Sequence, residues 1–282
     1  MIIDAHQHFW TLARGDYPWP NLSVSPIFQD FGPQDLEPLL KLSGVDRTVL
    51  VQATATVPET EFLLDLANYT DFVAAVVGWV PLDHEDAKLT IDRLAQHPKF
   101  RGVRPMLQDI SNTAWILQPN VLDALRHVAS CDLSMDALIQ PRHLPAIHQL
   151  LLEVPDLRLV VDHVAKPEMI SGKPDTWWKD GMSKLAAHRN CYCKLSGMVT
   201  EIGSNWTEDQ LAPFLSYVIE AFGTDRILWG SDWPVLNLAS DYQAWSSVFD
   251  QLLEPHAAVI SKRSCSDTTA AFYRIESRAN AT

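Results

Sequence analysis

The feature that most limits how this chain can fold is a series of eight short apolar runs. Each run is followed by a segment with apolar residues at three- and four-residue spacing. The runs are rich in Val, Ile and Leu and are apolar on both faces, which is typical of strands that are covered on both sides. The predicted strands are Ile2–Phe9, Arg47–Ala53, Val73–Val80, Phe100–Leu107, Leu133–Ile139, Arg158–Ala165, Cys191–Met198 and Arg226–Trp233. The predicted helices include Leu36–Leu42, Glu59–Asn68, Ala87–Ala95, Val121–Ala129, Leu144–Leu152, Trp178–His188 and Leu211–Ala221.

Strands that alternate with helices about every thirty residues predict βα units with parallel pairing and right-handed crossovers. Eight such strands favour a single (β/α)8 TIM barrel of the α/β class over an open doubly wound sheet, although the strand number alone does not exclude the open sheet. A dinucleotide-binding sheet needs G-x-G-x-x-G after its first strand, whereas here a Trp- and Pro-rich loop spans residues 10–33. Loops of this length are usually functional, so we expect it near the barrel mouth. Residues 1–282 are predicted to form one domain.

The charge balance limits the classes of partner. The chain has 282 residues and a formal charge of −13, from 22 Lys+Arg against 35 Asp+Glu. With no basic run, this balance argues against nucleic acid or an anionic membrane as a main partner, because little would neutralise phosphates. The N-terminus lacks a signal-peptide pattern, and the longest strongly apolar stretch, Phe72–Leu82, is too short to span a bilayer. We therefore expect a cytoplasmic protein, with its oligomeric state open.

Polar side chains gather where predicted strands end, which is where such barrels place their catalytic groups. The first strand ends with His6 and His8, which strand alternation places on one face. Two imidazoles that converge there can hold a divalent cation or bind an anionic oxygen. The sixth strand ends with Asp162 and His163, and the eighth ends with Asp232. Because polar groups beside a core cost free energy, packing alone does not account for them. We predict His6, His8, His163 and Asp232 as catalytic residues.

A cation and several aromatic residues also fall at the predicted mouth. Arg104 follows the fourth strand and could clamp a carbonyl, hydroxyl or carboxylate group. Trp79, Trp10 and Trp233 lie at strand ends or in the adjoining loop, and their faces suit the apolar side of a sugar ring. We predict these four as substrate-binding residues. Lys166 either faces the mouth or caps the next turn.

Taken in order, these motifs resemble the amidohydrolase superfamily. The shared pattern is Asp4-x-His6-x-His8 on the first strand, His163 on the sixth, and Gly230-Ser231-Asp232 on the eighth. One branch, that of the sugar-acid lactonases, is closer still, through the opening Met1 to Trp10, Gly15 to Trp19, Gly102-Val103-Arg104, Asp162 to Pro167, and Trp229 to Pro234. The resemblance covers essentially the whole chain. It implies a barrel hydrolase that opens an aldonolactone such as L-fucono-1,5-lactone.

The chain departs from the two-metal members of this superfamily. Those members supply a bridging Lys or Glu from the fourth strand and a His from the fifth. Here the fourth strand carries Arg104, and the fifth reads Ser134 to Gln140 without His or Lys, so we do not expect a binuclear site. What remains is one divalent ion held by His6, His8 and Asp232, with or without His163 and with zinc favoured by the ligand types, or no metal.

The resemblance also implies a mechanism and leaves rivals. Asp232 would draw a proton from water that attacks the lactone carbonyl, and would return it to the departing ring oxygen. The metal or the imidazoles of His6, His8 and His163 would stabilise the oxyanion. The alternatives are a lactonase for an anionic ring such as a muconolactone or pyrone dicarboxylate, a metal-dependent decarboxylase of aromatic acids, and a non-catalytic sugar-acid binding protein.

Overall fold

The computed structural model describes residues 1–276, and its centre is an eight-stranded parallel barrel. Neighbours in sequence are neighbours in the sheet, in the order β1 to β8, and each adjacent pair is parallel. The strands are β1 (Ile3–Gln7), β2 (Arg47–Val51), β3 (Val73–Gly78), β4 (Phe100–Val103), β5 (Ser134–Ala137), β6 (Arg158–Val161), β7 (Cys191–Leu195) and β8 (Ile227–Trp229). The predicted TIM barrel is therefore confirmed.

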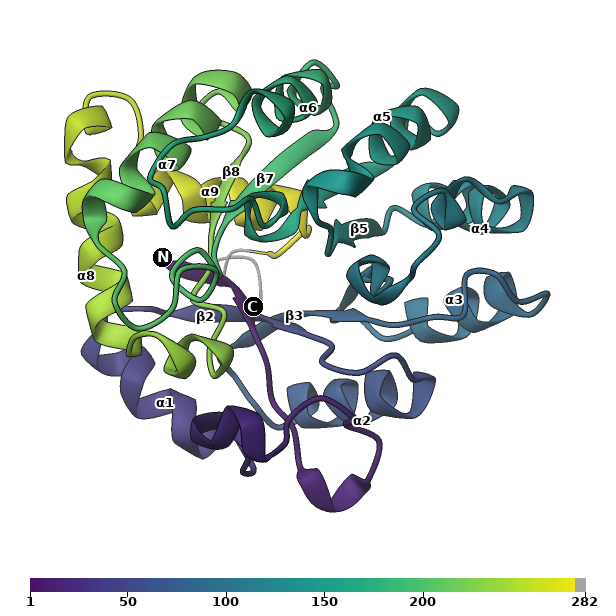
Figure 1. Ribbon diagram of the computed structural model, residues 1–282. Helices are drawn as coiled ribbons and strands as arrows, with labels where there is room; N and C mark the ends of the chain where they lie inside the picture. Colours follow the sequence, from purple (N-terminus) through teal and green to yellow (C-terminus); the bar gives the residue numbers. More distant parts are fainter. Residues whose placement is uncertain (277–282) are drawn as a thin grey trace.

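Helices surround the barrel (Figure 1). They are α1 (Pro33–Leu42), α2 (Val57–Asn68), α3 (Ala87–Ala95), α4 (Pro119–Ser130), α5 (Leu144–Glu153), α6 (Thr176–Ala186), α7 (Glu208–Phe222), α8 (Tyr242–Leu253) and α9 (Lys262–Phe272). The first seven match the predicted helices to within a few residues. Several begin at a side-chain cap: Thr56 accepts a hydrogen bond from Glu59 N, and Asp241 accepts one from Ala244 N. Among the described residues, no helix is long and apolar enough to cross a membrane.

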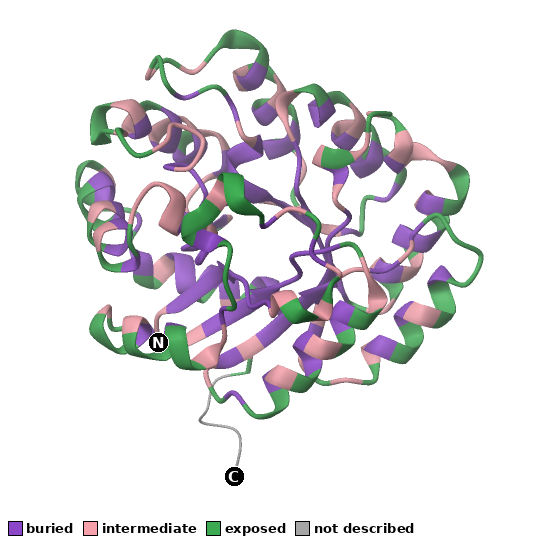
Figure 2. Ribbon diagram, turned by 60° about the horizontal axis from the view of Figure 1, so that its bottom comes forward, coloured by how far each residue is buried: buried purple, intermediate pink, exposed green. Residues whose placement is uncertain are grey.

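Two apolar clusters hold the layers together. One lies between the sheet and the helices, and the other fills the barrel itself, where Val49 and Val51 of β2 meet Ala75 and Val77 of β3. Leu50, between the two valines, belongs to the outer cluster, as strand alternation requires. Figure 2 shows this arrangement as buried strands inside helices whose outer faces are exposed.

The end of α9 and the residue that follows it reach into the barrel. Phe272 and Tyr273 pack in the inner cluster, and both are almost fully buried. Helix α9 itself packs against β8 and β1, and the Ser266 hydroxyl accepts a hydrogen bond from Ile3 N. The C-terminal segment therefore contributes directly to the barrel interior.

The predicted strands ran too far at their C-terminal ends. The sixth was expected to continue to Ala165, but β6 ends at Val161 and the chain enters a 3-10 turn over Asp162–Ala165. The eighth was expected to reach Trp233, but β8 ends at Trp229. Apolar character continues past both ends because these turns are buried, so composition alone could not locate the change in backbone direction.

The loop over residues 10–33 folds back on itself at the barrel mouth. Trp10 and Phe31 form an antiparallel bridge with backbone hydrogen bonds in both directions. Between them, the Trp19 indole donates to Ala53 O, 2.7 Å away, just beyond β2. The loop is thus anchored at its base and at its middle.

Candidate active site

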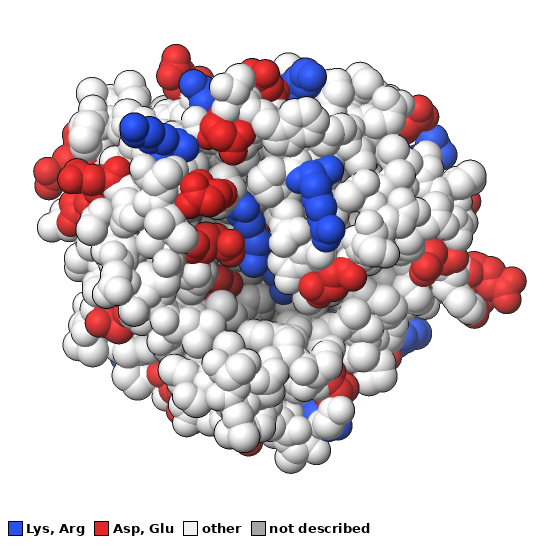
Figure 3. All heavy atoms as spheres, viewed as in Figure 1, with Lys and Arg blue, Asp and Glu red and all other residues white. Residues whose placement is uncertain are grey.

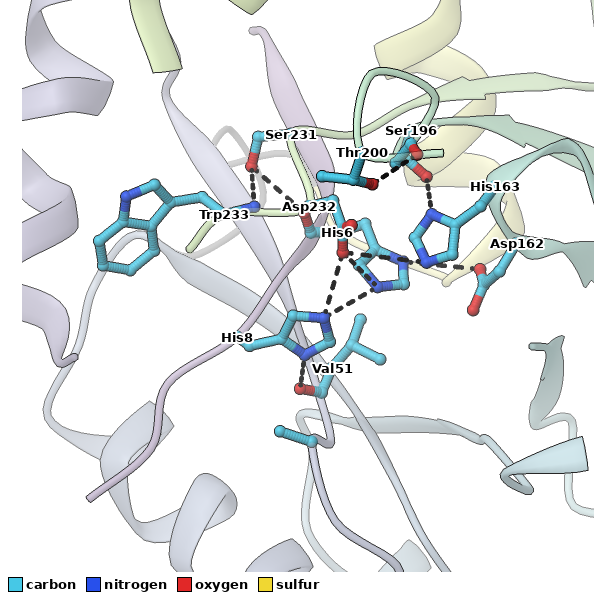
Figure 4. Close-up of polar contacts among 12 residues, drawn as sticks. His6, His8, Val51, Asp162, His163, Ser196, Thr200, Ser231, Asp232 and Trp233 are labelled. Atoms are coloured by element: carbon cyan, nitrogen blue, oxygen red, sulfur yellow. Dashed lines mark hydrogen bonds and ion pairs between the residues drawn. The ribbon is translucent and has the colours of Figure 1, made fainter. Parts of the chain in front are cut away.

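Three histidines and one aspartate converge at the floor of the barrel mouth (Figure 4). His6 Nε2 and His8 Nε2 lie 3.2 Å apart. Asp232 Oδ1 lies 3.6 Å from His6 Nε2, 3.4 Å from His8 Nε2 and 3.8 Å from His163 Nε2. The structure therefore brings together all four side chains that the sequence singled out as catalytic.

A bulge in β1 orients His6, which lies in that strand, and His8, which follows it. The pairing of β1 with β2 shifts register between Asp4 and Gln7. Ala5 packs in the inner cluster, yet the next residue, His6, also faces the barrel axis, so strict alternation fails once. After the bulge, His8 joins His6 at the mouth.

A left-handed backbone conformation positions the other two side chains, those of Asp232 and His163. Asp232 has φ 61°, and the four residues from His163 to Lys166 all have positive φ. Val164 is a β-branched residue at φ 48°, where such side chains are strained by about 1–3 kcal/mol. Backbone strain of this kind is common at functional sites, where contacts with the surrounding structure maintain the strained conformation.

Two glycines make room for the cluster. A Cβ on Gly230 would lie 2.7 Å from the Cβ of His6, so only glycine allows β8 to approach β1 this closely. Gly197 follows β7 with φ 61°, and its Cβ would lie 2.5 Å from His163 Nδ1 and 3.1 Å from Asp232 Oδ2. Gly230 belongs to a motif that the sequence singled out, whereas Gly197 does not.

Burial sets the protonation of the four groups. It lowers the pKa of His6, His8 and His163 below the usual value, that of His163 to about 4. Burial alone would raise the pKa of Asp232, but the neighbouring imidazoles outweigh it and hold that pKa below its usual range. At neutral pH the site therefore presents one ionised carboxylate among three neutral imidazoles.

Hydrogen bonds at the far ring nitrogens orient the imidazoles. His8 Nδ1 lies 2.8 Å from Val51 O, which can only accept, so His8 carries its proton on Nδ1 and leaves Nε2 with a lone pair. His163 Nδ1 lies 2.9 Å from the Ser196 hydroxyl. His6 Nδ1 lies 3.1 Å from Lys194 Nζ.

Below the histidines lies a group of fully buried ions that the sequence reading did not assign to the site. Lys194 Nζ lies 2.6 Å from Asp136 Oδ2 and 3.0 Å from Asp162 Oδ1. Tyr273 Oη donates to the same Asp136 oxygen, 2.7 Å away. A lysine within the apolar run Cys191–Met198 was the available signal, since lysine is rarely buried without a partner.

Arg104 reaches the site from the end of β4. Its guanidinium donates to Gln52 O and lies 3.5 Å from Asp162 Oδ2 and 3.4 Å from His6 Nε2. It is almost fully buried, yet it lines the cavity above the histidines. The structure thus places this predicted residue where a substrate oxygen would approach.

A cavity of about 600 Å³ opens above these groups, at the hollow seen on the face of Figure 3. Trp19, Trp79 and Trp115 contribute to its wall, together with apolar residues such as Met106 and Ile110. The lining includes two cations and three carboxylates, which are Arg104, Lys166, Asp83, Asp109 and Asp232. Lys166 pairs with Glu201 at 3.2 Å.

Two of the four residues predicted to bind substrate do not line this cavity. Trp10 is fully buried, donates from its indole to Gln29 O and packs edge-to-face on Phe31. Trp233 is also buried and packs edge-to-face on Phe31. Both residues hold the loop in place, whereas Trp79 and Arg104 face the cavity.

The spacing of three donor atoms suits a metal ion. A tetrahedral zinc ion with bonds of ~2.0–2.1 Å keeps its ligand atoms about 3.4 Å apart. The Nε2 atoms of His6 and His8 and Oδ1 of Asp232 are separated by 3.2, 3.4 and 3.6 Å. Neutral imidazoles and an ionised carboxylate are also the forms that bind metal. This donor set therefore fits one divalent ion.

The barrel and the group at its mouth define a class of hydrolase, and the chain belongs to the amidohydrolase family, whose model matches residues 3–275. A curated L-fucono-1,5-lactonase from Burkholderia ambifaria is 48% identical, covering 97% of this chain and 96% of that protein. Another L-fucono-1,5-lactonase, from Burkholderia multivorans, is 32% identical, covering 95% of this chain and 94% of that protein. The crystal structure of a Burkholderia multivorans amidohydrolase with bound Zn superposes with a TM-score of 0.89 at 32% identity, covering 98% of this chain and 100% of that one. These similarities confirm the family and the branch that the sequence motifs indicated.

Proposed function

We propose that this protein hydrolyses a neutral aldonolactone of the L-fucono-1,5-lactone type to the open aldonic acid. The observation that carries the proposal is the position of Asp232, whose Oδ1 lies within 3.8 Å of three imidazole nitrogens at the floor of the cavity. The 48% identity to a lactonase over nearly the whole chain supports the same reaction.

In the first step, the ionised Asp232 carboxylate takes a proton from a water molecule as its oxygen bonds to the lactone carbonyl carbon. The carbonyl π electrons move to oxygen, and Arg104 and His163, which line the cavity, face that developing charge, with His6 behind Arg104 at 3.4 Å. His8 is better suited to accept than to donate, because its proton is held by Val51 O. We therefore assign His8 to metal or water binding.

In the second step, the tetrahedral intermediate collapses and the bond from carbon to the ring oxygen breaks. The proton held by Asp232 passes to this departing oxygen, which becomes a hydroxyl group of the open chain. The new carboxylic acid releases its own proton to solvent. One turnover therefore consumes one water and yields an aldonate and one proton.

We propose that, if a metal is used, His6, His8 and Asp232 hold a single divalent ion, zinc by ligand type. A bound zinc ion would supply Lewis acidity toward the carbonyl oxygen and lower the pKa of a bound water. The related Zn-bound amidohydrolase supports this assignment. Rates measured with a chelator, and again after zinc is added back, test whether the ion is needed.

The charges around the cavity favour a neutral substrate over a dicarboxylate. Arg104 is engaged by Asp162 and Gln52 O, and Lys166 by Glu201. Asp83 and Asp109 add negative charge to the wall. An anionic ring would have to approach these carboxylates without a free cation among the lining residues, and would be repelled.

The test is acid release, followed with a pH indicator, on L-fucono-, L-rhamnono- and D-galactonolactone, with a muconolactone and 2-pyrone-4,6-dicarboxylate as anionic substrates. We expect rates far above spontaneous hydrolysis for one stereochemical subset of the sugar lactones. A preference for the anionic rings would overturn the proposed substrate class. Decarboxylation of an aromatic acid opens no lactone and would instead be detected as released carbon dioxide.

A further inference from the structure

Lys194 lies directly behind His6, on the side away from the cavity. It is a β7 residue with no exposed surface. Its ammonium nitrogen has three neighbours within hydrogen-bond distance: Asp136 Oδ2 at 2.6 Å, Asp162 Oδ1 at 3.0 Å and His6 Nδ1 at 3.1 Å. These three atoms match the three N–H groups of an ammonium.

This contact decides where the proton of His6 lies. An ammonium group has donors and no acceptor, so His6 Nδ1 must accept and carry no proton. A neutral imidazole then has its proton on Nε2. The Asp162 carboxylate, which would favour the opposite tautomer, is farther from Nδ1, at 3.5 Å.

The contact between His6 and His8 leads independently to the same tautomer. The two Nε2 atoms are 3.2 Å apart, and in the zinc-free site a hydrogen bond between them needs one donor. His8 has its proton on Nδ1, bound to Val51 O, so His6 is the donor. Arg104 Nη1, 3.4 Å from the same nitrogen, has a carboxylate acceptor in Asp162 Oδ2.

We propose that Lys194 is a positioning residue that holds His6 with its proton on Nε2, and that it thereby weakens zinc binding at His6, His8 and Asp232. The first part rests on the proposed function for its meaning, since the Nε2 proton of His6, donated to His8 Nε2, fixes the ring of His8 where it lines the cavity. The second part follows because a zinc ligand must offer a lone pair on Nε2. The ring proton would then move to Nδ1, where it faces the ammonium.

A purely structural role for Lys194 makes different predictions. Lys194 joins β7 to carboxylates that follow β6 and lie on β5, so its loss could simply loosen the barrel. Loosening would weaken zinc binding and would not select a tautomer. A gain in zinc affinity on removing Lys194 is therefore an outcome that structural damage does not produce.

The test compares three variants by ring-nitrogen NMR and by zinc titration, neither of which needs a substrate. Lys194→Met removes the ammonium, and the double variant Lys194→Met with Asp136→Asn removes one charge of each sign, so that the net buried charge is unchanged. The matched control is Tyr273→Phe, which removes another donor to Asp136 and leaves His6 untouched. Circular dichroism confirms the fold of each.

We expect the zinc-free wild-type protein to show His6 with its proton on Nε2, and the double variant to show substantial Nδ1 protonation. The zinc dissociation constant should fall at least roughly tenfold in the double variant and stay unchanged in Tyr273→Phe, while kcat falls more than KM changes. An Nδ1 proton on His6 in the wild-type protein, or equal or weaker zinc binding in the folded double variant, would overturn the proposal. These readouts decide the role of Lys194 even if no lactone proves to be a substrate.

Discussion

Replacing Asp232 by Asn removes the charge that both proton transfers use and keeps the size of the side chain. Asn cannot take a proton from water, and the three neutral imidazoles around it are weak substitutes because burial lowers the pKa of each. General-base assistance is worth roughly 10²–10⁴-fold in rate, and the same carboxylate serves the departing oxygen. We expect kcat to fall by at least that factor, which corresponds to about 3–5 kcal/mol in the activation free energy.

The assay is the initial rate of acid release from L-fucono-1,5-lactone, corrected for spontaneous hydrolysis. Asp123→Asn is the matched control, because Asp123 is an exposed carboxylate on α4 that pairs with Lys88 and does not line the cavity, and its rate should equal the wild-type rate. Thermal unfolding of both variants shows whether the fold is intact. A folded Asp232→Asn protein that keeps more than about a tenth of the wild-type kcat would refute the assignment of Asp232 as the base.

Three further changes test the geometry around the site. Gly197→Ala should lower both kcat and the melting temperature, by about 2–8 °C, because the added methyl group at positive φ would press on His163; kinetics and calorimetry check this, and an unchanged protein would contradict it. Trp79→Ala should raise KM several-fold with a smaller effect on kcat, since Trp79 forms cavity wall rather than floor; a loss confined to kcat would argue against ring binding there. Burial raises the pKa of the Glu59 carboxyl group to about 7 in the folded protein, above its ordinary value of 4.5. The stability that the fold gains from a protonated Glu59 is therefore fully present below pH ~4.5 and is lost as the pH rises through about 7. The melting temperature of Glu59→Gln should therefore decline less than that of wild type between pH 5 and pH 8, and parallel declines would exclude Glu59 as a cause.

Much of this fold is readable from the sequence because the barrel repeats one simple pattern. Each strand must be apolar on both faces, and each helix must be apolar on one, so periodicity locates them. The strand-end rule then gathers His6, His8, His163 and Asp232 from positions far apart in the chain. Composition could not show the bulge in β1 or the left-handed turn at His163, since both depend on contacts with neighbouring strands.

The strand-end rule does not predict the direction in which a side chain points. It correctly places Trp10 and Trp233 near the mouth, but it cannot say whether a ring enters the cavity or packs beneath the loop. Both rings found partners in Phe31, a residue 21 positions beyond Trp10 in the chain. Lys194 was missed for a related reason, because its carboxylate partners come from β5 and from the turn after β6.

The seam at which the barrel closes is also the backbone that carries the site. Between β8 and β1, His8 N donates to Trp233 O and Asp232 N donates to His6 O, each at 2.8 Å. Asp4 braces this seam, because one of its oxygens accepts hydrogen bonds from His6 N and Ser231 N. Separating the two segments would therefore open the barrel and pull Asp232 away from the histidines in one motion. The catalytic geometry is thus as stable as the closure itself, and the strained turns at the mouth are held by the same bonds that complete the fold.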